Sequence, residues 1–224
     1  MTPEPSAATA APQPTLSAKG TRLNKRGLET RQALLDAALR CLAQGGPEAV
    51  SASLIAREAG VTWGTVQHQF GGVDGLWAAL LEHVLDGGAA TALPVPDSPD
   101  LGERVLAVVG LLWTAMDLPV FRAIHNLRQA LPRDRDELEA TYPATAAAIA
   151  RWDSAWTDTV THAFAGLSLD PVRLSRVRSL LPGAMRGLYN EQFLSIYTDS
   201  GEARLGLAEA LTSYLSPSNP GRSS

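Results

Sequence analysis

The feature that most restricts the fold of this chain is the stretch SASLIAREAGVTWGTVQHQF at residues 51–70. In it, Ala56, Gly60 and Val66 are separated by four and then six residues. Apolar side chains accompany them at Ile55, Ala59 and Val61. A small residue at Ala56 lets two helices approach closely, and Gly60 permits a tight turn between them. The spacing therefore predicts a helix-turn-helix, with Thr62 as the N-cap of its second helix.

The second helix of this motif carries polar groups wherever packing does not require an apolar one. If Val66 and Phe70 pack inward, the side chains that remain outside are Thr62, Trp63, Thr65, Gln67, His68 and Gln69. Hydroxyl, amide and imidazole groups can hydrogen-bond to base edges and phosphates, and a helix of about two turns fits the major groove of DNA. We therefore predict that five of these residues contact DNA: Thr62, Trp63, Thr65, Gln67 and His68. The alternatives are a motif that serves only as architecture and, for Trp63, a ring that shields the domain.

Charge is distributed unevenly along the chain. Residues 19–70 hold seven Lys and Arg against four acidic residues, whereas residues 71–224 hold twelve Arg against eighteen Asp and Glu. The early basic residues are Lys19, Arg22, Lys25, Arg26 and Arg31. A basic arm ahead of an acidic body predicts that one end of the protein meets a polyanion, with a merely solvated tail as the alternative. We expect Lys25, Arg26 and Arg31 to bind DNA, Arg31 through phosphate.

Apolar residues recur with helical spacing along most of the chain, and no segment shows the sustained alternation of a β-strand. The first helix presents an apolar face formed by Leu34, Leu35, Ala38, Cys41 and Leu42, with Thr30 as its predicted N-cap and Gly45 at its end. Further helices are predicted at about 51–59, 62–70, 73–85, 100–117, 119–131, 134–166 with an optional break at Pro143, 171–198 with a kink at Pro182, and 201–215. The predicted fold class is all-α.

Composition points to a cytoplasmic protein without a membrane span. The chain is 45% hydrophobic and 19% charged, and no run offers the roughly 18 consecutive apolar residues of a spanning helix. Residues 1–18 are rich in Pro, Ala, Ser and Thr and lack the basic start and apolar run of a secretory signal. We expect a disordered tail there. The lone Cys41 is interpreted as a buried structural thiol, with a redox sensor as the alternative.

Residues from about 28 to 85 include the run TRQALLDAALRCLAQGGPEAVSASLIAREAGVTWGTVQHQFGGVDGLWAALLEHVL. This run resembles the DNA-binding region of the TetR family of bacterial regulators, in the pattern of its first helix, in IAREAGV, in the Gly-Thr step and in the His-x-Phe ending. The resemblance implies a homodimer whose subunits each have three N-terminal DNA-binding helices and a larger helical domain. Most members repress transcription and leave a near-palindromic operator when a small molecule enters that domain.

The sequence departs from the common pattern of that family at four positions, one of which is Trp63, where a polar or basic residue is frequent. Members usually carry tyrosine where this chain has Gln67 and Gln69, so the ring stacking and phosphate contact of the first tyrosine must be replaced by the Gln67 amide or lost. The lysine with which many members contact phosphate is replaced by Val73. The basic arm from Lys19 to Arg31 would compensate by adding phosphate or minor-groove contacts.

The resemblance also divides the chain into parts. These are a disordered tail at 1–18, a DNA-binding domain with its basic arm at 19–73, a ligand-binding and dimerisation domain at 74–216 and a flexible tail at 217–224. Aromatic and soft side chains line ligand cavities, so we expect an apolar or aromatic effector to contact a set consisting of Trp113, Phe121, His125 and Tyr189. The interface between two subunits is expected along Val177, Leu180, Leu181, Met185, Leu188, Leu205, Leu207, Ala208, Leu211 and Leu215.

Two other classes of function compete with a ligand-controlled repressor. An enzyme would need catalytic or metal-binding groups in a recognisable pattern, but His68, His83, His125 and His162 are scattered. We therefore predict no catalytic residue, no metal site and no cofactor. The second alternative is a DNA-binding regulator that senses no small molecule and is controlled by a protein partner, or one that activates transcription.

Overall fold

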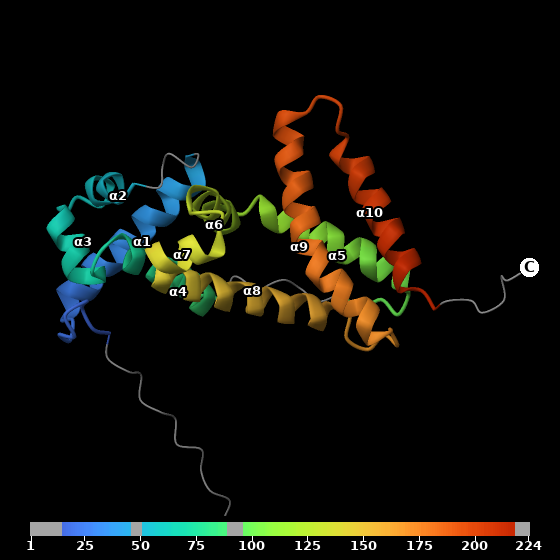
Figure 1. Cartoon of the computed structure of the whole chain (residues 1–224), viewed down its shortest axis with the longest axis horizontal. Coiled ribbons are helices and arrows are strands. Elements are labelled where there is room, and N and C mark those ends of the chain that lie inside the picture. The colour runs from blue at the N-terminus through green and yellow to red at the C-terminus, as the bar shows by residue number, and fades with distance from the viewer. Residues whose placement is uncertain (1–14, 46–50, 89–95, 218–224) are drawn as a thin grey trace, which may run out of the picture.

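The computed structural model describes residues 15–45, 51–88 and 96–217, and its regular elements in these ranges are ten α-helices (Figure 1). These ranges contain no strand beyond a single β-bridge between Leu16 and Arg22. The helices are α1 (Lys25–Gln44), α2 (Ala52–Glu58), α3 (Trp63–Phe70), α4 (Val73–Asp86), α5 (Leu101–Met116), α6 (Pro119–Ala130), α7 (Arg135–Thr141), α8 (Pro143–Ala163), α9 (Pro171–Leu194) and α10 (Ser200–Leu215). The predicted all-α fold is confirmed.

The first helix begins earlier than predicted. Its N-cap is Asn24, whose side-chain oxygen accepts a hydrogen bond from the Gly27 N–H at 2.9 Å. The prediction that Thr30 caps this helix was wrong, because Thr30 lies inside α1 and its hydroxyl donates to the Arg26 carbonyl at 2.9 Å. Both residue types can cap a helix, and the extended backbone at Asn24 decides between them. The basic residues from position 25 onward are therefore part of a helix.

The turn at Gly60 and the break at Pro143 are confirmed, and the kink expected at Pro182 stays a prediction. Gly60 has a φ of +68°, and its N–H donates to the Arg57 carbonyl at 3.0 Å, as expected of a left-handed residue after a helix. The break at Pro143 is also present, since α7 ends at Thr141 and α8 begins at the proline. Proline suits the first position of a helix because it has no N–H to leave unsatisfied there. Helix α9 remains continuous through Pro182.

The helices form two groups that α8 connects along one side (Figure 1). Helices α1–α4, α6 and α7 lie at one end of the molecule, and α5, α9 and α10 lie at the other. Consecutive helices α5 and α6 are bent by 76° relative to each other where the two groups meet. No single helix in the described part of the chain is long and apolar enough to cross a membrane. Helices α5 and α6 reach that length and apolar character only when they are taken together, and they are bent at their junction.

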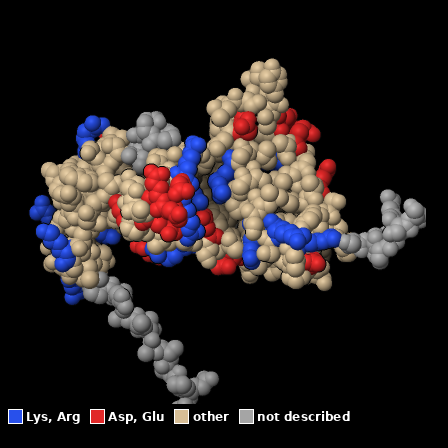
Figure 2. All heavy atoms as spheres, viewed as in Figure 1, with Lys and Arg blue, Asp and Glu red and all other residues tan. Residues whose placement is uncertain are grey.

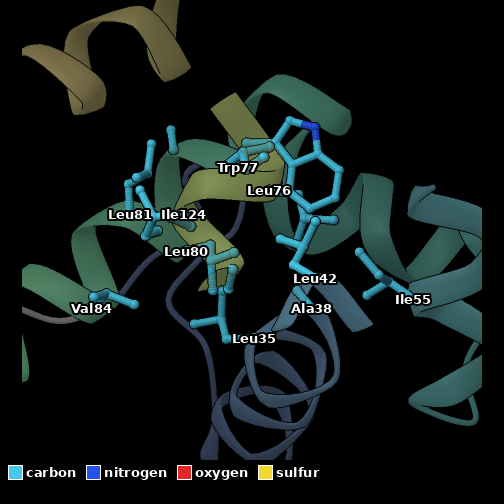
Figure 3. Packing of buried hydrophobic residues seen from close by; sticks show 14 of the residues in the cluster. Leu35, Ala38, Leu42, Ile55, Leu76, Trp77, Leu80, Leu81, Val84 and Ile124 are labelled. Atoms are coloured by element: carbon cyan, nitrogen blue, oxygen red, sulfur yellow. The ribbon is translucent and has the colours of Figure 1, made fainter. Parts of the chain in front are cut away.

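Helix α4 lies in the centre of the first hydrophobic core (Figure 3). Its Leu76, Trp77 and Leu80 are almost completely buried, and they pack in one cluster with Leu42 of α1 and Ile55 of α2. The same cluster extends to α6 and to the first half of α8. Cys41 packs at its edge and is half-buried, and burial raises the pKa of its thiol. The helix-turn-helix and its neighbours thus share one continuous core.

The second core corrects the predicted interface between subunits. Six of the ten residues assigned to that interface are buried inside a single chain, among α5, α8, α9 and α10: Val177, Leu181, Met185, Ala208, Leu211 and Leu215. Their assignment to an intermolecular seam was wrong, because the apolar spacing of two helices does not reveal which neighbour covers it. Leu188 and Leu207 are half-buried. Leu180 and Leu205 remain 56% and 45% exposed.

This distinction predicts different effects for two adjacent leucines of α9. Leu181 is 0% exposed, so Leu181→Ala should lower the free energy of unfolding by about 2–5 kcal/mol through the cavity it leaves. Leu180→Ala removes an exposed side chain and should change it by less than about 0.5 kcal/mol in the monomeric state. Urea unfolding followed by circular dichroism at low protein concentration measures both. Equal losses from the two variants would contradict the packing described for α9.

Candidate nucleic-acid interface and ligand site

Helix α3 is oriented by its two apolar anchors. Val66 is fully buried and Phe70 nearly so, while Thr62, Trp63, Gln67 and His68 are exposed as predicted. The ring of Trp63 is only 37% exposed, and therefore both of its interpretations, DNA contact and shield, fit the structure. An exposed row of hydroxyl, amide and imidazole groups along one short helix is suited to hydrogen bonding in a groove of DNA.

The first turn of α3 contains two threonine hydroxyls and, between them, an exposed glycine. The hydroxyl oxygens of Thr62 and Thr65 are 3.2 Å apart, so one donates to the other, and the Thr62 side chain makes no hydrogen bond to the N–H groups that begin α3. Thr65 is half-buried. Gly64 between them is exposed, and a Cβ placed there would meet nothing closer than the Thr62 hydroxyl at 3.7 Å. The missing side chain permits close approach of another molecule to the helix backbone.

Gln69 does not belong to the exposed surface. Its side chain is 4% exposed, and its Nε2 donates to the Gly27 carbonyl of α1 at 3.1 Å. The expectation that Gln69 faces outward was wrong, because the position after His68 turns back toward α1. Its buried Oε1 accepts no hydrogen bond from the described residues. Gln69 is a buried polar residue that connects α3 to α1, and the pattern of apolar residues in the sequence cannot predict such a position.

Arg31 fastens the other end of α3 to α1. Its Nη1 donates to the Gln69 carbonyl at 2.8 Å, and its guanidinium carbon lies 4.3 Å from the centre of the Phe70 ring. Burial lowers the pKa of this half-buried guanidinium, and the Glu82 carboxylate opposes that shift. A cation at the C-terminal carbonyls of a helix is favourable. The structure therefore gives Arg31 an internal role, and its predicted phosphate contact stays a prediction.

The basic arm is folded against α3. Residues 15–23 form a tight hairpin, in which the Leu23 N–H donates to the Thr15 carbonyl at 3.0 Å and Gly20 has a φ of +75°. At its tip, the Ala18 N–H donates to the His68 carbonyl at 3.2 Å. Residues 15–18 were expected in a disordered tail, and the remainder of that tail, residues 1–14, lies outside the described residues. Lys19 is thereby held beside α3.

Further basic residues lie at the start of α1, next to this hairpin. Lys25 and Arg26 occupy the first turn of the helix and are exposed, as is Arg22 in the hairpin. Figure 2 shows Lys and Arg atoms at the end of the molecule where α1 and α3 lie, whereas Asp and Glu atoms gather near its middle. The exposed side of α3 and the basic arm therefore belong to the same end of the protein.

Three of the four predicted ligand residues come together. The Tyr189 ring lies 5.8 Å from that of Trp113, 6.4 Å from that of His125 and 5.3 Å from that of Phe193, each measured between ring centres. Phe121 instead packs on other rings, 5.7 Å from Trp152 and 5.3 Å from Trp156, and belongs to the first core. We refer to Trp113, His125, Tyr189 and Phe193 as the aromatic cluster.

Polar groups that the sequence did not single out surround the aromatic cluster. The Tyr189 hydroxyl donates to the Asp117 carboxylate at 3.1 Å. Burial is the larger cause that raises the pKa of Tyr189, and the Asp117 carboxylate raises it further. Burial lowers the pKa of His125, a hydrogen bond to the Asn190 side chain opposes the shift, and Arg186 and Arg128 add to it. His125 is thus held in its neutral form, in which one ring nitrogen donates and the other accepts.

The two roles of arginine in the DNA-facing region can be separated by a pair of variants. Arg31→Ala should lower the free energy of unfolding by about 1–3 kcal/mol, because it leaves the Gln69 carbonyl without its charged donor. It should also weaken binding to every DNA sequence, since α3 loses its attachment. The exposed Arg26→Ala is the matched control and should weaken DNA binding without changing stability by more than about 0.5 kcal/mol. Urea unfolding and gel shifts test both; an undiminished stability of the Arg31 variant would refute the internal role.

The lowered pKa of His125 predicts a stability that depends on pH. Because the folded pKa lies below the unfolded value of about 6.5, the unfolded state takes up a proton more readily, and the free energy of unfolding should fall as pH drops below that value. His125→Gln should reduce this fall and have little effect above pH 7.5. Urea unfolding at pH 7.5, 6.5 and 5.5 provides the comparison. Parallel pH profiles for the variant and the parent protein would speak against a buried neutral imidazole.

Comparison with known proteins identifies the N-terminal region. Residues 34–80 match the model of the family described as "Bacterial regulatory proteins, tetR family". The HTH-type transcriptional regulator BetI of Brucella abortus (strain 2308) is 34% identical over 94 residues, which cover 41% of this chain and 48% of BetI. BetI of Burkholderia thailandensis is 33% identical over 96 residues, 41% of this chain and 49% of that protein. The chain thus spans about half the length of the curated relatives it matches.

Solved structures extend the similarity in fold to most of the chain. A tetR-family transcriptional regulator from Streptomyces coelicolor superposes with a TM-score of 0.61 at 22% identity, over 84% of this chain and 80% of that one. The multidrug binding protein EbrR, complexed with imidazole, gives a TM-score of 0.59 at 22% identity, over 90% of this chain and 98% of EbrR. The N-terminal region thus matches the TetR-family model over residues 34–80, and most of the chain shares the fold of these solved structures.

Proposed function

We propose that this chain is a DNA-binding transcriptional repressor of the TetR family, which leaves its operator when a small molecule binds among α5, α6 and α9. The observation that carries the proposal is the exposed side of α3, where the side chains of Thr62, Gln67 and His68 are exposed beside a basic hairpin. A protein of this kind works where DNA is accessible, so we also propose a cytoplasmic location. An enzymatic role has no support, because the aligned relatives are named as transcriptional regulators.

The structure offers a direct connection between the two ends of the molecule. The Asp74 carboxylate in the first turn of α4 accepts hydrogen bonds from the N–H groups of Ala144 and Thr145 at 3.0 and 2.8 Å, and the Thr145 hydroxyl donates to the Asp74 carbonyl at 3.0 Å. Glu82 of α4 pairs with Arg151 of α8. A shift of α8 would therefore move α4, and α3 precedes α4 by only two glycines.

The ligand part of the proposal rests on the aromatic cluster, which joins α5, α6 and α9 where the two groups of helices meet (Figure 1). EbrR, a protein of the same fold, is described as a multidrug binding protein and binds imidazole. Rings of the kind collected around Tyr189 can stack on a flat ligand at ring separations of about 4.5–7 Å.

Base readout by α3 predicts a specific pattern of losses. Thr65→Ala and Gln67→Ala should each cost about 1–3 kcal/mol at particular base pairs and relax the selected sequence there. Lys25→Ala should instead weaken all sequences similarly and reduce the slope of log K against log salt by about 0.9, the value for one phosphate contact. Operator selection from a random library, followed by titration at several salt concentrations, provides both measurements. An unchanged selected motif in both α3 variants would place base recognition elsewhere.

A dimer is needed for specific binding, because one helix of two turns reads few base pairs. Two copies related by a two-fold axis would read a near-palindromic site with half-sites about 34–36 Å apart, or a multiple of that distance. The exposed leucines of α9 and α10, Leu180 and Leu205, are candidates for the contact. Leu205 also lines, with Leu106 of α5, an apolar groove of about 420 Å³ that runs beside α10.

Charges at these two positions should separate the subunits without disturbing the core. The double variant Leu180→Glu with Leu205→Glu should sediment as a folded monomer and bind the operator much more weakly, since both side chains are exposed within one chain. Sedimentation velocity reports the oligomeric state, and a gel shift reports the affinity. A double variant that remains a dimer would move the interface away from α9 and α10. A monomer with undiminished operator affinity would contradict dimeric recognition.

A further inference from the structure

An arginine on each side of the joint between α6 and α9 lies near His125 of the aromatic cluster. Arg128 lies one turn after His125 on α6, and Arg186 lies one turn before Tyr189 on α9. Both are close enough to His125 to disfavour its protonated form, and they repel each other. Figure 2 shows Lys and Arg atoms on both sides of the hollow between these two parts of the molecule. The joint therefore carries positive charge from two helices.

The two arginines differ in how their charge is balanced. Arg128 donates to both carboxylate oxygens of Asp153, at 2.7 and 3.2 Å, in the two-bond geometry that satisfies a guanidinium well. Arg186 has neither an ion pair nor a hydrogen bond to any other residue in the described ranges, although it is half-buried. Burial lowers the pKa of Arg186, Arg128 adds to the effect, and Asp153 opposes it. A partly desolvated guanidinium that no acceptor of the described residues binds keeps its donors available to solvent or to an incoming anion.

The other charges near this position do not supply that anion. Asp117, the acid on the α5 side of the cluster, already accepts the Tyr189 hydroxyl. Arg204 of α10 lies over the Trp113 ring, with its guanidinium carbon 4.4 Å from the ring centre, and so adds positive charge on that side. Phe193, one turn beyond Tyr189, is 70% exposed and offers an apolar surface at the rim. Positive charge and aromatic rings thus lie together, and no carboxylate of the described residues binds the Arg186 guanidinium.

We propose that this joint binds an organic anion, a carboxylate attached to an aromatic body, with Arg186 as the residue that recognises the carboxylate. The inference rests on the proposed function and specifies the chemical class of its ligand. A guanidinium presents two parallel N–H donors to a carboxylate, which a neutral amide of the same shape cannot match. The rings of Trp113, Tyr189 and Phe193 receive the body of the ligand. A polyanion such as DNA would be recognised instead by α3, at the end of the molecule away from this joint (Figure 1).

The test uses pairs of compounds that differ only in charge. Benzoate is compared with benzamide, 1-naphthoate with 1-naphthamide, and acetate serves as a carboxylate without a body; binding to the full chain is followed by tryptophan fluorescence and calorimetry. Each aromatic carboxylate should bind about tenfold or more tightly than its amide, which is the size expected of hydrogen bonds to a charged group. Arg186→Gln should abolish that preference, and Arg186→Lys should retain part of it. Arg176→Gln removes the same charge from an exposed position of α9 and should leave it intact.

A second readout separates recognition from a structural role. Without ligand, Arg186→Gln relieves the repulsion with Arg128 and should leave the melting temperature unchanged or raise it. A lower melting temperature combined with equal loss of carboxylate and amide binding would identify Arg186 as structural and overturn the proposal. So would affinities for the carboxylates that do not exceed those for the amides, or acetate binding as tightly as 1-naphthoate. These measurements contain no DNA, so a failure of operator binding in gel shifts would be recognised separately as a failure of the proposed function.

Discussion

The burial of Trp77 and its neighbouring leucines fixes α4 between two sets of helices. On one side α4 packs against the helix-turn-helix, and on the other it packs along α8, to which Asp74 adds hydrogen bonds. Burial of large apolar side chains contributes about 1.5–3 kcal/mol for each one, so this contact outweighs the polar bonds beside it. The position of α3 relative to the C-terminal helices therefore depends on α4, and the proposed response to a ligand depends on it as well.

The sequence was informative wherever one local rule decides the structure. Gly60 needs a left-handed backbone, Pro143 must begin a helix rather than continue one, and the anchors Val66 and Phe70 determine which side of α3 is exposed. It was uninformative where a distant segment decides. Gln69 is a polar residue in an exposed-looking pattern, but the Gly27 carbonyl of α1 draws it inward. The apolar spacing of α9 and α10 correctly indicated that most of their leucines pack against other helices. Those helices belong to the same chain and not to a second subunit.

The ligand site shows the same division. The aromatic residues at positions 113, 125 and 189 could be selected by residue type, and the fold brings them together. Phe121 could not be told from them, because a ring in a core and a ring beside a ligand look alike in sequence. The charge that gives the site its expected chemistry was not predicted at all. A guanidinium becomes informative only when the structure shows that Arg186 is half-buried and that Asp153 is already bound to Arg128.

The folded hairpin at residues 15–23 has a consequence for how the proposed operator would be read. A flexible arm loses about 1–2 kcal/mol of backbone conformational entropy for each residue that DNA orders, whereas this arm has lost that freedom on folding. Because this hairpin is already ordered, its binding to DNA should lose less conformational entropy than the binding of a flexible arm. A preorganised arm also has a fixed reach. Lys19 would then meet the phosphates at a constant offset from α3, and half-sites of altered groove geometry would be tolerated less well than by a protein with a floating arm.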